Sequence, residues 1–307
     1  MMKILFIARL FYPHIGGVEK HIYEVAEKLN IKGNSVTILT EKYDKKLKNA
    51  ETVDTIKVVR FSYPHVKLVG LIFIYWQLFK NRKLIEKAEI VHVHDVFIWY
   101  LLFKLIYPNK KVYMTFHGWE EIWPIPWKNI ILKQIASKLS DRNITVGEYV
   151  HKYYRIKTNK VIYGAATVLR SNVAKSKNAI VYVGRLEKNT GLLEFLKYLD
   201  KNKQYTVDFC GDGPLREQCE KYGTVHGFTD PTPFLKKAEY CVPGGYLAAL
   251  EGLAANCELK LFWNNKIKED YWKMSPFYKL TGKELTDWAK QQTWEKLADE
   301  YLKLYDH

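Results

Sequence analysis

The sequence has 307 residues, enough for about two domains of ordinary size. Hydrophobic residues make up 48% of it and charged residues 26%, proportions that exclude an intrinsically disordered chain. The formal net charge of +15 favours an anionic partner: nucleic acid, anionic lipid headgroups and phosphorylated substrates all meet that requirement equally well.

Apolar runs of strand length alternate with longer amphipathic segments in the first half of the chain. This alternation is typical of a parallel sheet with helical crossovers. The apolar start has no small-residue cleavage site after it, which favours a β-strand over a signal peptide. The sequence predicts strands at 3–8, 36–40, 56–61, 90–94, 112–117, 144–146 and 161–163, with a helix at 18–29.

The polar segment 171–178 interrupts this pattern and predicts a linker. The alternation then restarts, with strands expected at 179–183, 206–210, 224–226 and 239–242 and a last amphipathic helix at 293–305. Two doubly wound α/β domains in tandem are the simplest architecture. Ligands of such sheets bind at the carboxyl ends of the strands.

The cysteines and the longest apolar stretch bear on the cellular compartment. Cys210, Cys219, Cys241 and Cys257 form no CxxC pair and are predicted to be buried thiols of a reducing compartment. The apolar stretch 68–76 is far shorter than the roughly 20 residues of a spanning helix. We therefore expect a chain that does not cross a membrane, although it can lie on one.

Polar and glycine-rich motifs follow the predicted strands of the first half. Gly16 and Gly17 stand directly before a helix, where backbone N–H groups and the helix dipole favour an anion. VHVHD at 91–95 and TFHGWE at 115–120 each end a strand. A turn before an ordinary helix and a structural histidine are the alternatives. No cysteine or HxxxH partner supports zinc.

The second half repeats this arrangement. Arg185 and Lys188 follow one strand, and Gly211 and Gly213 follow the next. Gly244 and Gly245 precede a helix that carries Glu251, and a glycine pair at a helix start suits phosphate, as does a nearby guanidinium. Each motif alone is equally a surface turn or a solvated charge. Their order and their recurrence at strand ends favour a binding site.

Seven motifs in this order, GGVEKH, HVHD, FHG, GRLEKNTG, CGDGP, HGFTD and LEGLAANC, resemble those of the retaining, family-four glycosyltransferases with the GT-B fold. That family includes bacterial mannosyltransferases and glycogen synthases. The resemblance covers nearly the whole chain. It implies two Rossmann-like domains facing a cleft, a nucleoside-diphosphate sugar as donor, and neither a cofactor nor an obligatory metal. The expected boundaries are 1–170 for the acceptor-binding domain, 178–290 for the donor-binding domain, and 291–307 for a helix that crosses back to the first.

The resemblance also implies roles for single residues. Gly16 and Gly17 match the loop facing the donor diphosphate and the acceptor, and His117 matches the histidine that contacts the transferred sugar. Arg185 matches the arginine that neutralises the departing diphosphate, and Glu251 the glutamate that holds the donor ribose. The regions around the nucleotide are matched by Gly211, Gly213, His226, Gly227 and Phe228.

Two positions depart from the family pattern. The family usually has a glutamate eight residues before Glu251, where this chain has Pro243, and a lysine before Gly191, where it has Thr190. Three interpretations stay open: family variation with Lys188 reaching in from a shifted loop, an unusual donor sugar, or weakened or lost activity. The last would make the chain a nucleotide-sugar-binding pseudoenzyme.

Residues 66–134 mix aromatic and basic side chains densely. One interpretation is that the first domain docks on an anionic membrane and takes a lipid-linked acceptor, which places the protein on the cytosolic face of that membrane. The other is core packing plus a solvated lysine face. A nucleic-acid-binding protein is disfavoured because no helix-turn-helix, zinc-finger or RRM signature is present. The candidate membrane residues are Trp76, Lys80, Arg82, Lys83, Trp99, Lys104, Trp123 and Trp127.

Overall fold

The structure, a computed structural model, describes residues 1–120, 122–167 and 173–306, and it divides into two α/β units. The first domain comprises Met1–Val146, Val150–Ile162 and the end of the chain from Leu297. The second comprises Gly147–Tyr149 and Tyr163–Lys296, whereas the sequence placed its limits at 178 and 290. The earlier start has a packing reason, since the Tyr163 ring contacts the rings of Tyr246, Phe277 and Trp288.

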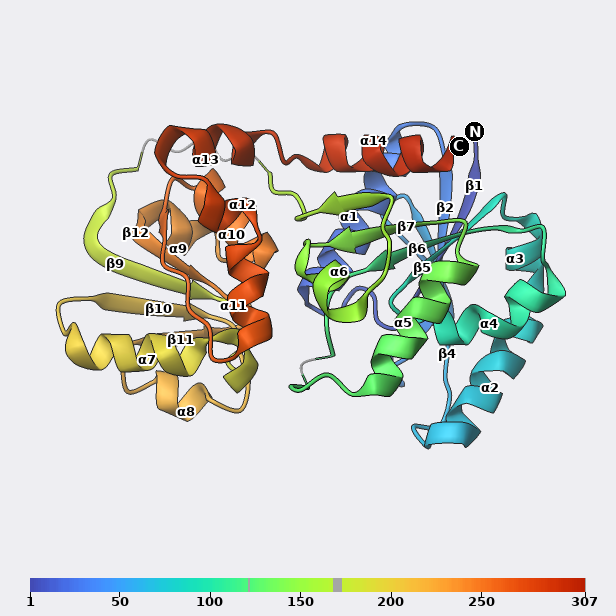
Figure 1. Ribbon diagram of the computed structural model, residues 1–307, viewed down its shortest axis with the longest axis horizontal. Helices are drawn as coiled ribbons and strands as arrows, with labels where there is room; N and C mark the ends of the chain where they lie inside the picture. Colours follow the sequence, from blue (N-terminus) through green and yellow to red (C-terminus); the bar gives the residue numbers. More distant parts are fainter. Residues whose placement is uncertain (121, 168–172, 307) are drawn as a thin grey trace. The chain divides into compact units, whose positions relative to one another are not determined.

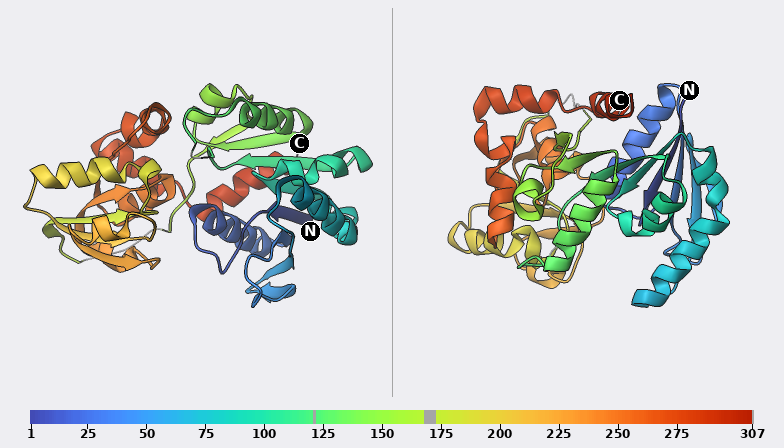
Figure 2. Two further views of the ribbon diagram at one scale, coloured as in Figure 1. Left: turned by 90° about the horizontal axis from the view of Figure 1, so that it is seen from below. Right: turned by 45° about the vertical axis from the view of Figure 1, so that its right-hand side comes forward.

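The first domain is built on an eight-stranded sheet in the order β3-β4-β2-β1-β5-β6-β7-β8, with helices on both faces (Figures 1 and 2). All neighbours are parallel except the antiparallel pair of β3 and β4. The strands are β1 Lys3–Ala8, β2 Ser35–Glu41, β3 Ala50–Val53, β4 Ile56–Phe61, β5 Ile90–His94, β6 Lys111–Phe116, β7 Arg142–Val146 and β8 Lys160–Ile162. Only β3 was not predicted, because its sequence AETV is partly exposed and lacks an apolar run.

Among the helices of the first domain, the first buries a clear apolar stripe, whereas two later ones bury one residue each. In α1 (Gly17–Ile31) the buried positions include Ile22, Val25, Ala26 and Leu29, the spacing of one helical face. The others are α2 Lys67–Lys80, α3 Arg82–Lys87, α4 Phe97–Ile106, α5 Trp127–Leu139 and α6 Tyr149–Tyr154, and the chain ends in α14, Trp294–Tyr305. Of these, α3 and α5 bury one residue each.

The second domain is built on a parallel five-stranded sheet in the order β11-β10-β9-β12-β13. Its strands are β9 Ser176–Val183, β10 Thr206–Cys210, β11 Thr224–Gly227, β12 Ala238–Pro243 and β13 Glu258–Leu259. Its helices are the 3-10 turn η1 Lys188–Thr190, then α7 Leu192–Lys201, α8 Arg216–Cys219, α9 Thr232–Lys237, α10 Tyr246–Ala254, α11 Lys266–Lys273, α12 Pro276–Lys279 and α13 Gly282–Lys290. The two-residue β13 was not predicted, since it is too short for a pattern.

The predicted linker at 171–178 is wrong at its end. Ser176 to Asn178 are the first residues of β9, and Ser176 pairs with Ala238 of β12. The Asn178 N–H donates to the Glu239 carboxylate at 2.7 Å, so a side chain completes the pairing where the ladder is irregular. Residues 171 and 172 lie outside the described residues.

The four cysteines are buried and free, as the sequence predicted. Burial raises the pKa of the Cys210 thiol to about 12, so the thiol stays protonated. Among the described helices, none has both the length and the apolar character that a membrane crossing requires.

Candidate functional site

The strand ends of the first domain bring three histidines together. The Nδ1 atom of His94, at the end of β5, lies 2.9 Å from Nε2 of His117, which follows β6. Their rings stack at 5.2 Å, and the His21 ring of α1 stands edge-on to His117 at 4.8 Å. The backbone N–H of His117 donates to the Asp95 carboxylate at 3.0 Å. The predicted residue His117 therefore belongs to a fixed cluster.

A second layer of polar groups supports this cluster from α14. His92 lies 2.7 Å from the Tyr305 hydroxyl through Nδ1 and 2.7 Å from the Thr115 hydroxyl through Nε2. The Tyr301 hydroxyl lies 3.0 Å from Thr115 Oγ1 and 2.9 Å from His21 Nε2. The C-terminal helix thus supplies hydroxyl partners that fix the rings of two histidines.

The clustered histidines are neutral at physiological pH. Burial is the main cause: it lowers the pKa of His21, His92 and His94 well below the ordinary value, and the neighbouring histidines lower it further. Burial and the Lys133 ammonium lower the pKa of His117 to about 3. A neutral imidazole offers one donor and one acceptor, so this cluster suits a hydroxyl ligand better than an anion.

The Gly16–Gly17 loop already holds a carboxylate. Gly16 has an extended backbone and precedes α1, and a methyl group there would clash with the Glu19 carboxylate. The same carboxylate lies 3.2 Å from His14 Nδ1. A Cβ on Gly17 would meet nothing within 4 Å. An anion at this helix start must therefore compete with or displace Glu19.

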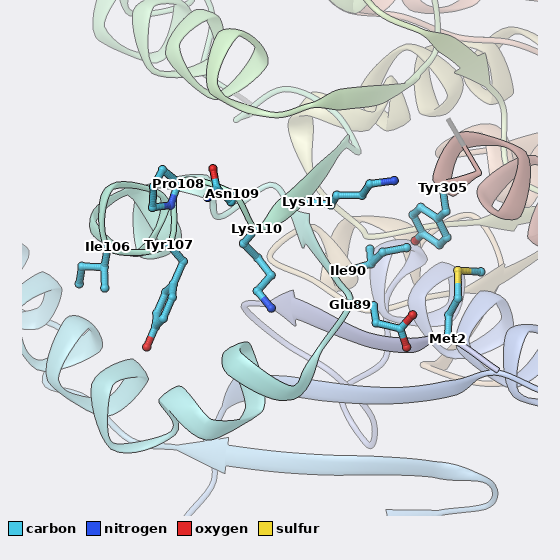
Figure 3. A pocket seen from close by; sticks show the side chains of 10 residues that line it. All are labelled: Met2, Glu89, Ile90, Ile106, Tyr107, Pro108, Asn109, Lys110, Lys111 and Tyr305. Carbon is cyan, nitrogen blue, oxygen red and sulfur yellow. The ribbon is translucent and has the colours of Figure 1, made fainter.

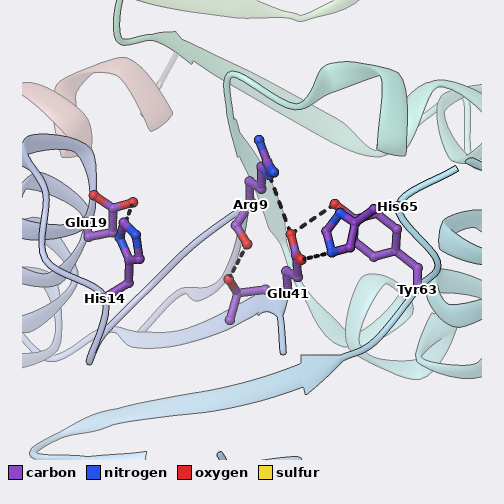
Figure 4. A network of polar contacts seen from close by, with 7 residues as sticks. Arg9, His14, Glu19, Glu41, Tyr63 and His65 are labelled. Atoms are coloured by element: carbon purple, nitrogen blue, oxygen red, sulfur yellow. Dashed lines mark hydrogen bonds and ion pairs between the residues drawn. The ribbon is translucent and has the colours of Figure 1, made fainter. Parts of the chain in front are cut away.

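A polar network that the sequence did not predict lies nearby (Figure 4). The buried Glu41, at the end of β2, accepts from the Tyr63 hydroxyl at 2.9 Å and lies 3.0 Å from His65 Nε2 and 3.5 Å from Arg9 Nε. Arg9 and His65 keep most of their side chains exposed. A carboxylate between two exposed basic groups can accept from a polyhydroxylated ligand.

In the second domain, backbone segments after three strands meet. The Gly184 backbone, after β9, approaches Gly244, after β12, so closely that a Cβ on Gly184 would lie 2.9 Å from the Gly244 Cα. Gly211, after β10, faces the Gly184 carbonyl with no room for a methyl group. This convergence places Arg185 beside Gly244. Its side chain is half exposed and lies 3.4 Å from the Glu187 carboxylate.

The start of α10 has two partners from α11. The Tyr246 N–H donates to the Tyr271 hydroxyl at 2.7 Å, and the two rings stack at 3.8 Å. The Lys268 ammonium donates to the Gly244 carbonyl at 2.8 Å. Lys268 was not predicted, although a lysine three and four residues before two aromatic residues of an amphipathic helix was a signal that could have been used.

The two departures from the family pattern have structural roles. The Thr190 hydroxyl is buried, donates to the Glu187 carbonyl at 2.7 Å and accepts from Tyr182 at 2.9 Å. Pro243 is buried at the end of β12 and pairs with Val183. Lys188 is exposed on η1, where its carbonyl accepts from Asn264 at 2.7 Å.

The remaining predicted donor residues are spread over the carboxyl side of the second sheet. Glu251 is half-buried on α10. His226 lies 2.7 Å from the Asp208 carboxylate and its ring packs on Phe234 at 4.2 Å, which indicates a structural role. Gly213 and Gly227 both have positive φ, and the Phe228 side chain is exposed.

The prediction of a membrane-facing surface is wrong for two residues, Trp99 and Lys104. Trp99 is only 5% exposed, because it packs on Phe61 and Tyr63 with ring centroids 5.6 Å apart in each case. The Lys104 side chain is largely buried and lies 3.3 Å from Asp141. Most of their surface is therefore unavailable to a lipid surface. The remaining predicted residues all keep exposed side-chain area: Trp76, Lys80, Arg82, Lys83, Trp123 and Trp127.

A pocket of about 620 Å³ opens at the opposite, amino end of β5 and β6 (Figure 3). The Lys110 ammonium there bonds to the carbonyls of Ala88 and Glu86, at 2.6 and 3.1 Å. None of the predicted site residues lines this pocket. Its lining consists of Met2, Glu89, Ile90, Ile106, Tyr107, Pro108, Asn109, Lys110, Lys111 and Tyr305.

No group of three or more histidine, cysteine, aspartate or glutamate side chains among the described residues has the arrangement to hold a metal ion.

Sequence comparisons relate the chain to sugar-transferring proteins. Residues 15–160 match the family model described as Glycosyltransferase Family 4. The phosphatidylinositol N-acetylglucosaminyltransferase GPI3 subunit of Saccharomyces cerevisiae is 24% identical over 242 residues, which cover 69% of this chain and 53% of that protein. The chain spans about half the length of the yeast relatives it matches.

Solved structures share the fold over the whole chain. Sucrose-phosphate synthase from Thermosynechococcus elongatus matches with a TM-score of 0.78 at 15% identity, covering 100% of this chain and 98% of that one. Anabaena Alr3699/HepE in complex with UDP and glucose matches with a TM-score of 0.67 at 13% identity, covering 99% and 100%. At identities this low, the structural similarity shows that the chain has the same fold as these proteins and nothing more specific.

Proposed function

We propose that this chain, which has the GT-B fold of glycosyltransferases and a first domain of the Glycosyltransferase Family 4 type, transfers a hexosyl group from a nucleoside-diphosphate sugar to an acceptor. The observation that carries the proposal is the convergence of Gly184, Gly211 and Gly244 around Arg185 in the second domain. There the Arg185 cation and closely packed glycine backbone meet at the strand ends where such sheets bind nucleotides.

The proposed reaction keeps the anomeric configuration and uses no metal. The bond between the anomeric carbon and the diphosphate oxygen breaks, and the acceptor oxygen bonds to the same face of that carbon. The acceptor proton passes to the leaving phosphate. Arg185 stabilises the negative charge that develops on that phosphate. In the first domain, the neutral His117 can hydrogen-bond a sugar hydroxyl.

The test is a screen of nucleotide sugars with mass detection of the released nucleoside diphosphate and of the product. We expect one donor to give release that depends on an acceptor. Binding of a nucleotide sugar without release from any donor would favour a pseudoenzyme. If isothermal titration finds no binding to any of them, the proposed function is wrong.

We propose further that the acceptor is lipid-linked and that the first domain docks peripherally on an anionic, cytosolic membrane face. One side of α2 exposes Leu68, Ile72, Trp76 and Phe79, with the Lys80 ammonium 3.4 Å from the centre of the Trp76 ring. In α5 exposed apolar residues recur every four positions, at Trp127, Ile131 and Ile135, and Leu132 is exposed beside them. Apolar stripes beside lysines are typical of helices that lie in a membrane interface. The similarity to the yeast phosphatidylinositol N-acetylglucosaminyltransferase subunit also supports a phospholipid acceptor.

Liposome binding checks this surface. We expect the protein to cosediment with vesicles containing phosphatidylglycerol at low salt and to dissociate as salt rises. The double substitution Trp76→Ser and Phe79→Ser should weaken binding about tenfold or more, since it removes two interfacial aromatic rings. Ile31→Ser, which changes an exposed apolar residue at the end of α1, is the matched control. Absence of binding at low ionic strength would contradict the proposal.

A further inference from the structure

Lys268 is a buried lysine in the second domain. It lies in the first turn of α11, where the Asn265 side chain accepts from its backbone N–H at 2.8 Å. The residue is only 4% exposed. Its ammonium lies 4.1 Å from the centre of the Tyr271 ring and 5.1 Å from that of Trp272, so two aromatic faces enclose the charge.

The charge of Lys268 has no anionic partner. Its ammonium donates to the Gly244 carbonyl, and among the described residues no carboxylate lies within ion-pair distance. The other two lysines of α11 differ, since Lys266 and Lys273 pair with Glu269 at 2.9 and 2.6 Å. Burial, reinforced by the Arg185 guanidinium, lowers the pKa of Lys268 to about 7. Such a buried cation is costly unless an anion joins it.

The surroundings of Lys268 favour an anion from outside the protein. The Gly184 backbone lies against Gly244, whose carbonyl accepts from Lys268, and Arg185 is the next residue after Gly184. The Arg185 guanidinium is close enough for its charge to lower the pKa of Lys268. The N–H groups of Gly245 and Leu247 at the start of α10 also have no acceptor among the described residues. The start of α10 therefore has two N–H groups without an acceptor in the described part of the chain, beside the Lys268 ammonium, and the Arg185 charge acts on the same lysine.

We propose that Lys268 is a binding residue for the donor, and that its ammonium holds phosphoryl oxygens of the diphosphate together with Arg185. This inference rests on the proposed function and adds to it a residue from α11. It also accounts for Thr190, whose hydroxyl is engaged within its own turn: the second cation of the site comes from another element. An ammonium offers three donors, enough to keep the Gly244 carbonyl and still reach two phosphoryl oxygens.

The test compares nucleotide binding by isothermal titration at fixed salt. UDP, GDP and ADP are titrated into the whole protein, and the diphosphate that binds tightest is compared with its monophosphate. We expect Lys268→Met to weaken the diphosphate about 10- to 100-fold, the size of a lost charge-assisted contact, and the monophosphate less. Lys268→Arg keeps the charge and should retain most of the affinity.

The matched control is Lys273→Met, which removes a charge from the same helix at an ion pair on the surface. It should leave diphosphate affinity unchanged. The melting temperature of the ligand-free protein is a second measurement, and we expect Lys268→Met to change it in the opposite direction to the affinity. Lys268→Met should raise it, because an uncompensated buried charge is replaced by an apolar side chain of similar length. A lysine that served only the fold would lower it.

Three results would overturn the inference while leaving the proposed function in place. They are equal diphosphate affinity of the wild type and Lys268→Met, equal weakening by Lys268→Met and Lys273→Met, or a Lys268→Met variant that melts lower and binds normally. If none of the three diphosphates binds the wild-type protein, the proposed function is wrong, and the inference with it.

Discussion

Replacement of Arg185 by alanine is expected to lower the turnover number about 100- to 1,000-fold, the usual cost of removing one donor aimed at developing charge. The free energy of unfolding should change little. The Arg185 side chain is half exposed and its ion pair with Glu187 is long, at 3.4 Å, so the pair contributes little to folding. Turnover with the best donor from the screen and urea unfolding of both proteins are the measurements.

Lys197→Ala is the control for Arg185→Ala. Lys197 is a largely exposed cation of the same domain, on α7, and its loss should affect neither turnover nor unfolding. Similar losses in both variants would point to a general effect of net charge. A drop in the unfolding free energy of Arg185→Ala as large as the drop in transition-state stabilisation would contradict a role in the reaction.

Acid is expected to unfold the first domain steeply below pH 6.5. Burial holds all four clustered histidines neutral, so their folded-state pKa values lie below that of an unfolded histidine, near 6.5; the four are His21, His92, His94 and His117. Below pH 6.5 the histidines are protonated in the unfolded chain but stay neutral in the folded chain. The free energy of unfolding therefore falls as pH falls. Each such group contributes up to about 1.4 kcal/mol per pH unit, and the four together up to about 5.4 kcal/mol per pH unit.

Hydrogen exchange resolved by domain, at pH values from 8 to 5, checks this prediction after correction for the intrinsic pH dependence of exchange. Protection of β1, β5 and β6 should collapse between pH 6.5 and 5. The second domain, whose one histidine is the partly exposed His226, should lose less. His94→Asn, which removes a ring with an unpartnered buried nitrogen, should reduce the pH slope by about a quarter. Parallel loss of protection in both domains would contradict the assignment to these histidines.

Most of the fold followed from the sequence because the strands of a parallel sheet are buried on both faces. Strands such as Lys3–Ala8, Ile56–Phe61, Ile90–His94 and Thr206–Cys210 therefore appear as apolar runs with the limits observed. The exceptions, β3 and β13, are an exposed edge strand and a two-residue strand, which leave no such pattern.

The aromatic residues of the first domain show that the sequence pattern does not predict which of them are exposed. Trp76 and Trp99 stand in similar aromatic, basic surroundings in the sequence, but Trp76 is exposed on α2, whereas Trp99 packs on Phe61 and Tyr63. Which face of a helix meets the rest of the domain depends on the packing of distant segments. Composition around the two tryptophans carries no such information.

The sequence by itself determined the two α/β domains and put Gly184, Arg185, Gly211 and Gly244 at strand ends, since local apolar runs and turn residues encode both. Only the tertiary structure decided which groups at those ends act together. In the folded chain, the Thr190 hydroxyl accepts a hydrogen bond from Tyr182, and hydroxyls of α14 bond to the histidine cluster. Lys268 is buried and donates to the Gly244 carbonyl. The electrostatic energy of these groups depends on burial and on partners up to 280 residues away, and no local pattern records either.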